Sequence, residues 1–227
     1  MALLEAGYPV LAATVAQSVL AGMLLIMAPL VMLKRQPFAS GSRWRVFMYF
    51  ASIGLAFLFV EIVFLQKLLR FVQQPTVALA LVLATFLIGA GAGSAWAGSR
   101  ASTAHPQRRL LNAVVAVVVI GALYSVAFDP LLAQLSGGSM IARAAVAVLL
   151  IAPLAFFMGM PFPLALRELE EPLVPWAWGI NGCASVVSPA LATLLAIDLG
   201  FTTVLLFALA LYLAVPAWFP RATPAVT

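Results

Sequence analysis

Long apolar runs separated by short polar segments make up most of this chain. A helix crosses a hydrocarbon layer of about 30 Å with roughly 20 residues. Seven runs reach about that length, at residues 10–33, 44–66, 76–98, 110–128, 144–166, 176–197 and 201–218. The pattern predicts one all-α domain over residues 1–227, a polytopic membrane bundle of seven transmembrane helices joined by short loops.

The basic residues predict the orientation of this bundle, because cytoplasmic loops collect Lys and Arg. If the N-terminus lies outside, three basic residues fall on the outer side: Lys67, Arg70 and Arg143. The other nine fall on the inner side: Lys34, Arg35, Arg43, Arg45, Arg100, Arg108, Arg109, Arg167 and Arg221. We therefore predict an outer N-terminus and a cytoplasmic C-terminus.

The composition agrees with a lipid environment and excludes several kinds of site. Of 227 residues, 65% are hydrophobic and 8% charged, whereas soluble domains are about 45–50% apolar and about 25% charged. Cys183 and His105 are the only residues of their types, so a disulfide framework or a multi-histidine metal site within the chain is excluded. The positive-inside bias accounts for the net charge of +5, and no nucleic-acid partner is expected. We predict no cofactor, no metal and no catalytic residues.

Glu61 is the most unusual residue of the predicted spans. It lies within eight residues that are otherwise apolar, Phe57 to Phe64, and a charge buried in lipid is costly. Lys67 follows six residues later and Arg70 nine residues later, so neither reaches Glu61 along the same helix. We expect Glu61 to face the bundle interior. It then serves as a functional group, as a neutral carboxyl that joins helices, or as a carboxyl that water reaches from the outer side.

A second polar group lies on the predicted sixth span. Asn181, Ser185 and Ser188 follow an i, i+4, i+7 spacing and share one helix face. Pro189 comes directly after them and is expected to kink the helix. Such a stripe lines a ligand cavity or, the interpretation we favour, packs closely against a neighbouring helix.

Small residues predict close helix packing elsewhere. Gly89, Gly93 and Ala97 are spaced four apart, and Gly182 extends the small face of the sixth span. Two prolines and Gly159 predict a break in the fifth span near its cytoplasmic end. Asp129 before Pro130 is expected to lie in a turn at an outer helix end.

Several strings together resemble one protein family. They are residues 54–66 (GLAFLFVEIVFLQ), 74–76 (QPT), 91–94 (GAGS), 157–164 (FMGMPFPL) and 175–182 (PWAWGING). This set resembles the C-terminal membrane region of bacterial membrane-bound spermidine/spermine synthase-like proteins, from about residue 51 to residue 212. In that family a soluble Rossmann-type domain performs the transfer reaction, and this chain has no counterpart of it. The resemblance implies a multi-pass protein of the bacterial inner membrane with no polyamine synthesis of its own.

Two function hypotheses follow. The first is a non-catalytic integral membrane subunit that anchors or organises a protein partner, either a synthase-like soluble domain or a larger inner-membrane complex. The second is a transporter or binding protein for a small cationic or apolar metabolite, with a site formed by Glu61, Gln66, Asn181, Ser185 and Ser188. A quinone or lipid-tail site and a membrane-embedded enzyme are further alternatives that the sequence does not favour.

Overall fold

The computed structural model describes residues 2–22, 24, 40–99 and 105–220, and this part of the chain is helical without strands. The helices are α1 (Ala2–Gly22), α3 (Ser40–Val72), α4 (Pro75–Gly98), α5 (Pro106–Leu135), α6 (Met140–Met158), α7 (Pro161–Leu166), η3 (Glu171–Leu173), α8 (Val174–Leu199), α9 (Phe201–Ala214) and η4 (Val215–Trp218). Six stretches of the described residues are long and apolar enough to cross a membrane. The predicted all-α membrane bundle is confirmed at this level.

The predicted first span, 10–33, falls only partly on described residues. Helix α1 begins earlier, at Ala2, and its apolar part is the short stretch Ala12–Gly22. Residues 23 and 25–33 lie outside the described residues.

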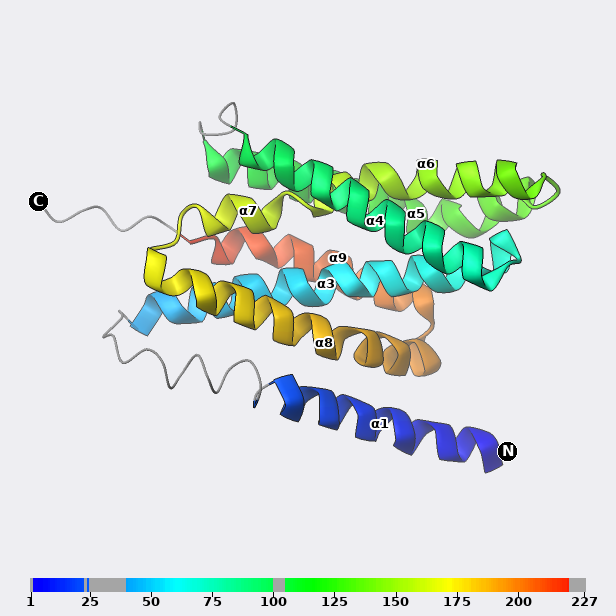
Figure 1. Cartoon of the computed structure of the whole chain (residues 1–227), viewed down its shortest axis with the longest axis horizontal. Coiled ribbons are helices and arrows are strands. Elements are labelled where there is room, and N and C mark those ends of the chain that lie inside the picture. Colours follow the sequence, from blue (N-terminus) through cyan, green and yellow to red (C-terminus); the bar gives the residue numbers. More distant parts are fainter. Residues whose placement is uncertain (1, 23, 25–39, 100–104, 221–227) are drawn as a thin grey trace, which may run out of the picture.

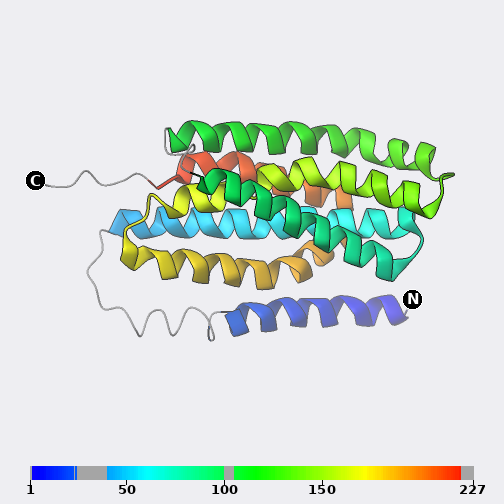
Figure 2. The ribbon, with the colours of Figure 1, turned by 45° about the horizontal axis from the view of Figure 1, so that its top comes forward.

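Helix α3 occupies the centre of the bundle (Figures 1 and 2). It packs extensively against α8, α9 and α4, and also touches α5, α6 and α7. Helix α1 packs along α8 at the edge of the bundle, and the start of α1 and the end of η4 lie at opposite ends of the molecule (Figure 1). The central position explains why α3 carries so many buried large side chains, among them Tyr49, Phe50 and Phe64.

An aromatic cluster joins α3 to α4 and α5. The ring of Phe64 lies 5.7 Å from that of Phe86, 5.7 Å from that of Tyr124 and 4.9 Å from that of Phe128. These tilted and edge-on contacts are favourable ring geometries. The Tyr124 hydroxyl donates a hydrogen bond of 2.9 Å to the Leu150 carbonyl, so the same cluster also holds α6.

Glycines bring α4 into close contact with α6. A Cβ atom at Gly89 would lie 2.8 Å from the Ala155 Cβ, and one at Gly93 would overlap the Phe156 carbonyl. Ala97, one turn further, is also buried, whereas Gly182 is half-buried on α8. Only the absence of side chains at Gly89 and Gly93 allows this helix separation.

Three arginines bind the carbonyl groups at the ends of other helices. Arg45 Nη2 donates hydrogen bonds of 3.0 Å to the carbonyls of Ala217 and Phe219, at the end of η4. Such terminal carbonyls have no partner within their own helix.

The other two arginines act at α3 and α4. Arg143 Nη1 donates to the Phe71 carbonyl over 3.2 Å, near the end of α3. Arg167 donates to the carbonyls of Ala97 and Gly98, which end α4. A cation at a helix C-terminus also interacts favourably with the helix dipole.

The structure contradicts the predicted end of the fourth span and confirms the predicted break in the fifth span. The sequence predicts that the fourth span ends at residue 128, with Asp129 in a turn, and this is wrong: α5 continues through Pro130 to Leu135. Pro130 removes only one backbone donor, and Lys67 Nζ holds Asp129 in place at 2.7 Å. The predicted break in the fifth span is confirmed, because α6 ends at Met158 and α7 begins at Pro161.

The close approach of α4 to α6 predicts a sharp contrast between two glycines. Gly93→Ala forces the α6 backbone to move and should destabilise the protein by about 1–3 kcal/mol, the usual cost of overpacking. A Cβ at Gly91 meets no atom within 4 Å, so Gly91→Ala should leave stability unchanged. Thermal unfolding of both variants in mild detergent tests this, and equal melting temperatures would contradict the packing described.

Candidate functional site

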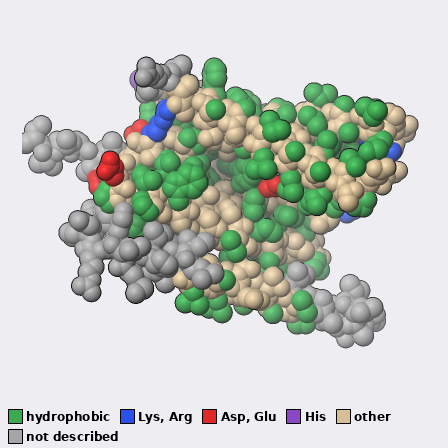
Figure 3. Space-filling model, in the orientation of Figure 1, with side chains coloured by type: hydrophobic (Ala, Val, Ile, Leu, Met, Phe, Trp, Pro, Cys, Tyr) green, Lys and Arg blue, Asp and Glu red, His purple; other side chains and the backbone are tan. Residues whose placement is uncertain are grey.

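A groove of about 480 Å³ opens between α4 and α8. Helix α3 forms its base, and the junction of α6 and α7 closes one end. The groove is lined by Ile53, Gly54, Phe57, Leu87, Ala90, Gly91, Ser94, Met158, Gly159, Phe162, Trp178, Asn181 and Ser185. We call it the α4–α8 groove. Figure 3 shows the corresponding face of the molecule, which is hollowed between these helices.

The groove exists because α4 and α8 both pack on α3 but have almost no contact with each other. At its end, Gly159 lies against the Ala90 backbone so closely that a Cβ at Gly159 would overlap it. On the other side, α8 approaches α3 at Gly54, where a Cβ would lie 2.9 Å from the Asn181 carbonyl oxygen. These two glycine contacts set the positions of both sides of the groove.

Polar side chains interrupt the apolar lining of the groove. Asn181 and Ser185 come from α8 and Ser94 from α4. The side chains of these three residues make no hydrogen bond to any other residue in the described part of the chain. They can therefore donate to, or accept from, a molecule that enters the groove.

Glu61 lies next to the groove on α3. It follows Phe57 by one helical turn and Gly54 by two, so the three residues lie on one face of the helix. Its side chain is half-buried. Glu61 is the one acidic residue of α3.

Glu61 forms no ion pair or hydrogen bond with another described residue. The nearest basic residue along α3, Lys67, is bound to Asp129 of α5 through both carboxylate oxygens at 2.7 Å. This ion pair agrees with the prediction from the sequence that Lys67 does not reach Glu61 along the same helix. The sequence did not identify Asp129 as the partner, although both residues lie at the same predicted end of their spans.

The remaining two residues of the predicted polar site lie elsewhere. Ser188 is fully buried and its hydroxyl donates a hydrogen bond of 2.9 Å to the Leu55 carbonyl, which joins α8 to α3. Gln66 follows Glu61 by five residues, about 140° around the helix, and does not line the groove. The structure thus brings Asn181 and Ser185 together, with Glu61 one turn beyond, and separates Ser188 and Gln66 from them.

The sequence did not identify several of the groove residues as candidate site residues. Trp178, 57% exposed, and Phe162 lie edge to face with ring centroids 4.6 Å apart, at the end of the groove. Ser94 and Gly91 belong to a segment whose small residues predict helix packing. Only the arrangement of α4 and α8 around α3 shows that Gly91 faces open space.

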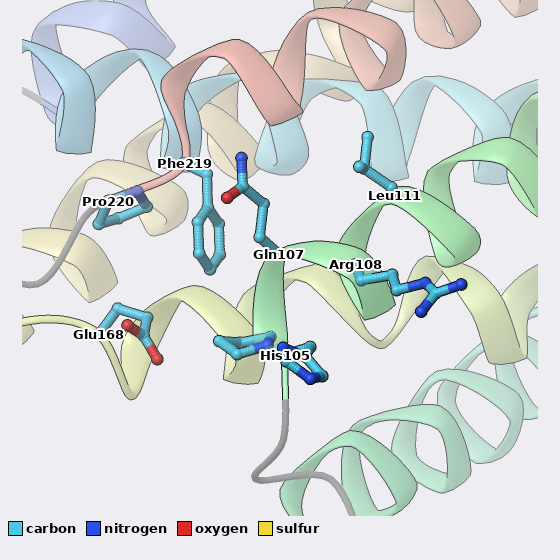
Figure 4. A pocket seen from close by; sticks show the side chains of 8 residues that line it. His105, Gln107, Arg108, Leu111, Glu168, Phe219 and Pro220 are labelled. Atoms are coloured by element: carbon cyan, nitrogen blue, oxygen red, sulfur yellow. The ribbon is translucent and has the colours of Figure 1, made fainter.

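A second pocket, of about 540 Å³, lies where α5 begins. Figure 4 shows its labelled side chains: Glu168 and Phe219 on one side, His105 and Gln107 from the start of α5, and Arg108 directed away from Glu168. The charged groups are spread around the rim and do not converge on one point. Residues 100–104, which precede His105 in the sequence, are outside the described part.

A smaller pocket, of about 230 Å³, lies at the opposite end of the bundle. The ion pair of Lys67 and Asp129 forms one side and Arg70 the other. The charges of Lys67 and Asp129 neutralise each other, and their ion pair is part of the contact between α3 and α5. We therefore assign no binding role to this pocket.

No group of three or more His, Cys, Asp or Glu residues within the described residues could hold a metal ion. Comparison with known protein families, curated proteins and solved structures found no match to this chain.

The different positions of Ser188 and Ser185 predict different effects of the same substitution. Ser188→Ala removes the hydrogen bond to Leu55 and should lower stability by about 0.6 kcal/mol, the average for interhelical hydrogen bonds in membranes, and by at most about 1.7 kcal/mol. Ser185→Ala should change stability by less than about 0.5 kcal/mol, because its hydroxyl has no partner within the described chain. Unfolding titrations in detergent or bicelles measure both values, and an equal loss in the two variants would contradict this assignment.

Proposed function

We propose that this chain is a non-catalytic integral membrane subunit that anchors or organises a protein partner, and that the partner binds within the bilayer at the α4–α8 groove. The observation that carries the proposal is a set of polar side chains without a partner in the described chain: Asn181 and Ser185, which line the groove, and Glu61, which lies one helical turn beyond the lining residue Phe57. Lipid tails offer no hydrogen bonds to these groups. A protein segment can.

The resemblance to the membrane region of spermidine/spermine synthase-like proteins supports the same function. A synthase-like soluble domain on a separate chain, or a larger complex of the bacterial inner membrane, is the partner that this resemblance implies. The proposal includes seven spans, an outer N-terminus and a cytoplasmic C-terminus. Nine of the twelve basic residues support this orientation through the positive-inside rule.

A second candidate function is the binding or transport of a small cationic or apolar metabolite. The half-buried carboxyl of Glu61 favours it, because a carboxylate attracts an amine. The open groove argues against it, since small-molecule sites usually bury about 70–90% of their ligand. Loss of uptake or binding of candidate amines in Glu61→Gln would support this second function.

Site-specific crosslinking in native membranes tests the partner proposal. Leu87 lines the groove and is 72% exposed, whereas Val119 of α5 is 61% exposed and lies outside the groove. A photo-crosslinking residue at position 87 should give a discrete protein adduct, identified by mass spectrometry, and the same residue at position 119 should not. Lipid adducts alone at both positions would contradict the proposal.

Cysteine labelling in intact cells tests the orientation. With Cys183 replaced by Ala, single cysteines are placed at Gly137, between α5 and α6, and at Gln107, at the start of α5. A membrane-impermeant maleimide should label position 137 before lysis and position 107 only afterwards, since the two positions lie at opposite ends of α5. The reverse pattern would place the N-terminus in the cytoplasm.

A further inference from the structure

The helices around the groove provide no cation for the half-buried carboxyl of Glu61. Helix α4 has no charged residue, and the only charged residue of α8 is Asp198, near its end. On α3, Lys67 is already paired with Asp129. The helices that flank the groove thus offer Glu61 no basic group.

The depth of Glu61 places this acid inside the bilayer. The predicted span of α3, residues 44–66, ends about 8 Å beyond Glu61 at 1.5 Å per residue. Bulk water lies beyond either end. A helix of a partner that also lies in the membrane can bring a cation to this depth.

The groove beside Glu61 has the surface that a helix needs for close packing. Gly91 is exposed, with nothing within 4 Å of a Cβ position, and Ala90 lies beside it. Small residues allow a second helix backbone to approach closely. Asn181 and Ser185 on the opposite side can form hydrogen bonds to polar groups of that helix.

From these observations we infer the kind of partner: a transmembrane helix that carries a Lys or Arg at the depth of Glu61, packs into the α4–α8 groove and pairs its cation with Glu61. This inference rests on the proposed function and makes it more specific. The partner helix gives the carboxylate its counter-ion and covers the exposed small residues of α4. A free amine would satisfy Glu61 but leave the open groove to lipid.

Designed peptides test this inference even while the natural partner is unidentified. The probe is a 22-residue Leu/Ala transmembrane helix with one central Lys, compared with the same helix with Leu in place of the Lys and with a third whose Lys lies at one end. Binding to the full chain in lipid nanodiscs is measured by fluorescence energy transfer. We expect the central Lys to tighten binding about tenfold over the Leu peptide, and the terminal Lys to give little gain.

Substitutions in the chain identify the acid responsible. Glu61→Gln should abolish the preference for the central Lys, whereas Glu61→Asp should retain most of it. Glu168→Gln makes the same chemical change at an acid near the start of α8, far from Glu61 along the bundle, and should leave the preference unchanged. Unfolding curves of each variant separate loss of binding from loss of fold.

Three outcomes would overturn the inference. The first is equal binding of the Lys and Leu peptides, or a Lys preference that survives Glu61→Gln. The second is native mass spectrometry that finds a bound small amine lost in Glu61→Gln, and the third is a crosslink from position 87 to a second copy of this chain. If position 87 crosslinks a different protein that has no intramembrane Lys or Arg, the proposed function stands and this inference fails.

Discussion

The main constraint on this structure is that the bilayer interior offers no water to polar groups, so each must find a partner in protein. Most polar groups of the described residues do. Arg45, Arg143 and Arg167 bind carbonyls at the ends of three helices, and the hydroxyls of Tyr49 and Ser188 bind the Pro161 and Leu55 carbonyls. These bonds join segments far apart in sequence, since Arg45 and Phe219 are 174 residues apart. The same hydrogen bonds therefore satisfy backbone carbonyls and hold the helices together. This explains why basic residues at the membrane boundaries contribute to the fold as well as to orientation.

Close packing is the second requirement, since association between helices in lipid depends on van der Waals contact and interhelical hydrogen bonds. Gly89 and Gly93 let α4 touch α6, and Gly54 lets α8 touch α3. Helix α3 receives contacts from both sides as a result. Because glycine contacts hold α4 on α6 and α8 on α3, and α4 and α8 have almost no contact with each other, the space between them becomes the groove. The same glycines that stabilise the bundle thus determine the position of its opening.

Six of the predicted spans correspond to stretches of the described residues that are long and apolar enough to cross a membrane, because such lengths depend on hydrophobicity alone. The sequence also predicted the break near Gly159 and the isolation of Glu61 from Lys67, which follow from local geometry. It was wrong about the end of α5, where the contact of Asp129 with Lys67 lies between two helices and has no local signal. The groove could not be predicted, because Gly91 and Gly93 look alike in sequence and only the neighbours of α4 show that Gly93 packs against Phe156 and Gly91 faces open space. Likewise, Ser185 and Ser188 share a helix face, yet only the position of α3 distinguishes their roles.

Unsatisfied polar groups of the described residues fall into two kinds, and the difference indicates where another molecule can bind. Arg143 Nε and the Tyr212 hydroxyl have no hydrogen-bond partner, but both are enclosed by the chain itself, so nothing from outside reaches them without a change in packing. The absence of hydrogen bonds to these two atoms lowers the stability of the folded chain. Asn181 and Ser185 line an open groove, and Glu61 lies half-buried beside it. A second molecule can bind these groups with the bundle as it stands, and the energy gained then appears as affinity for that molecule. The same rule that makes an intramembrane acid costly for the isolated chain therefore makes it a source of specificity in a complex.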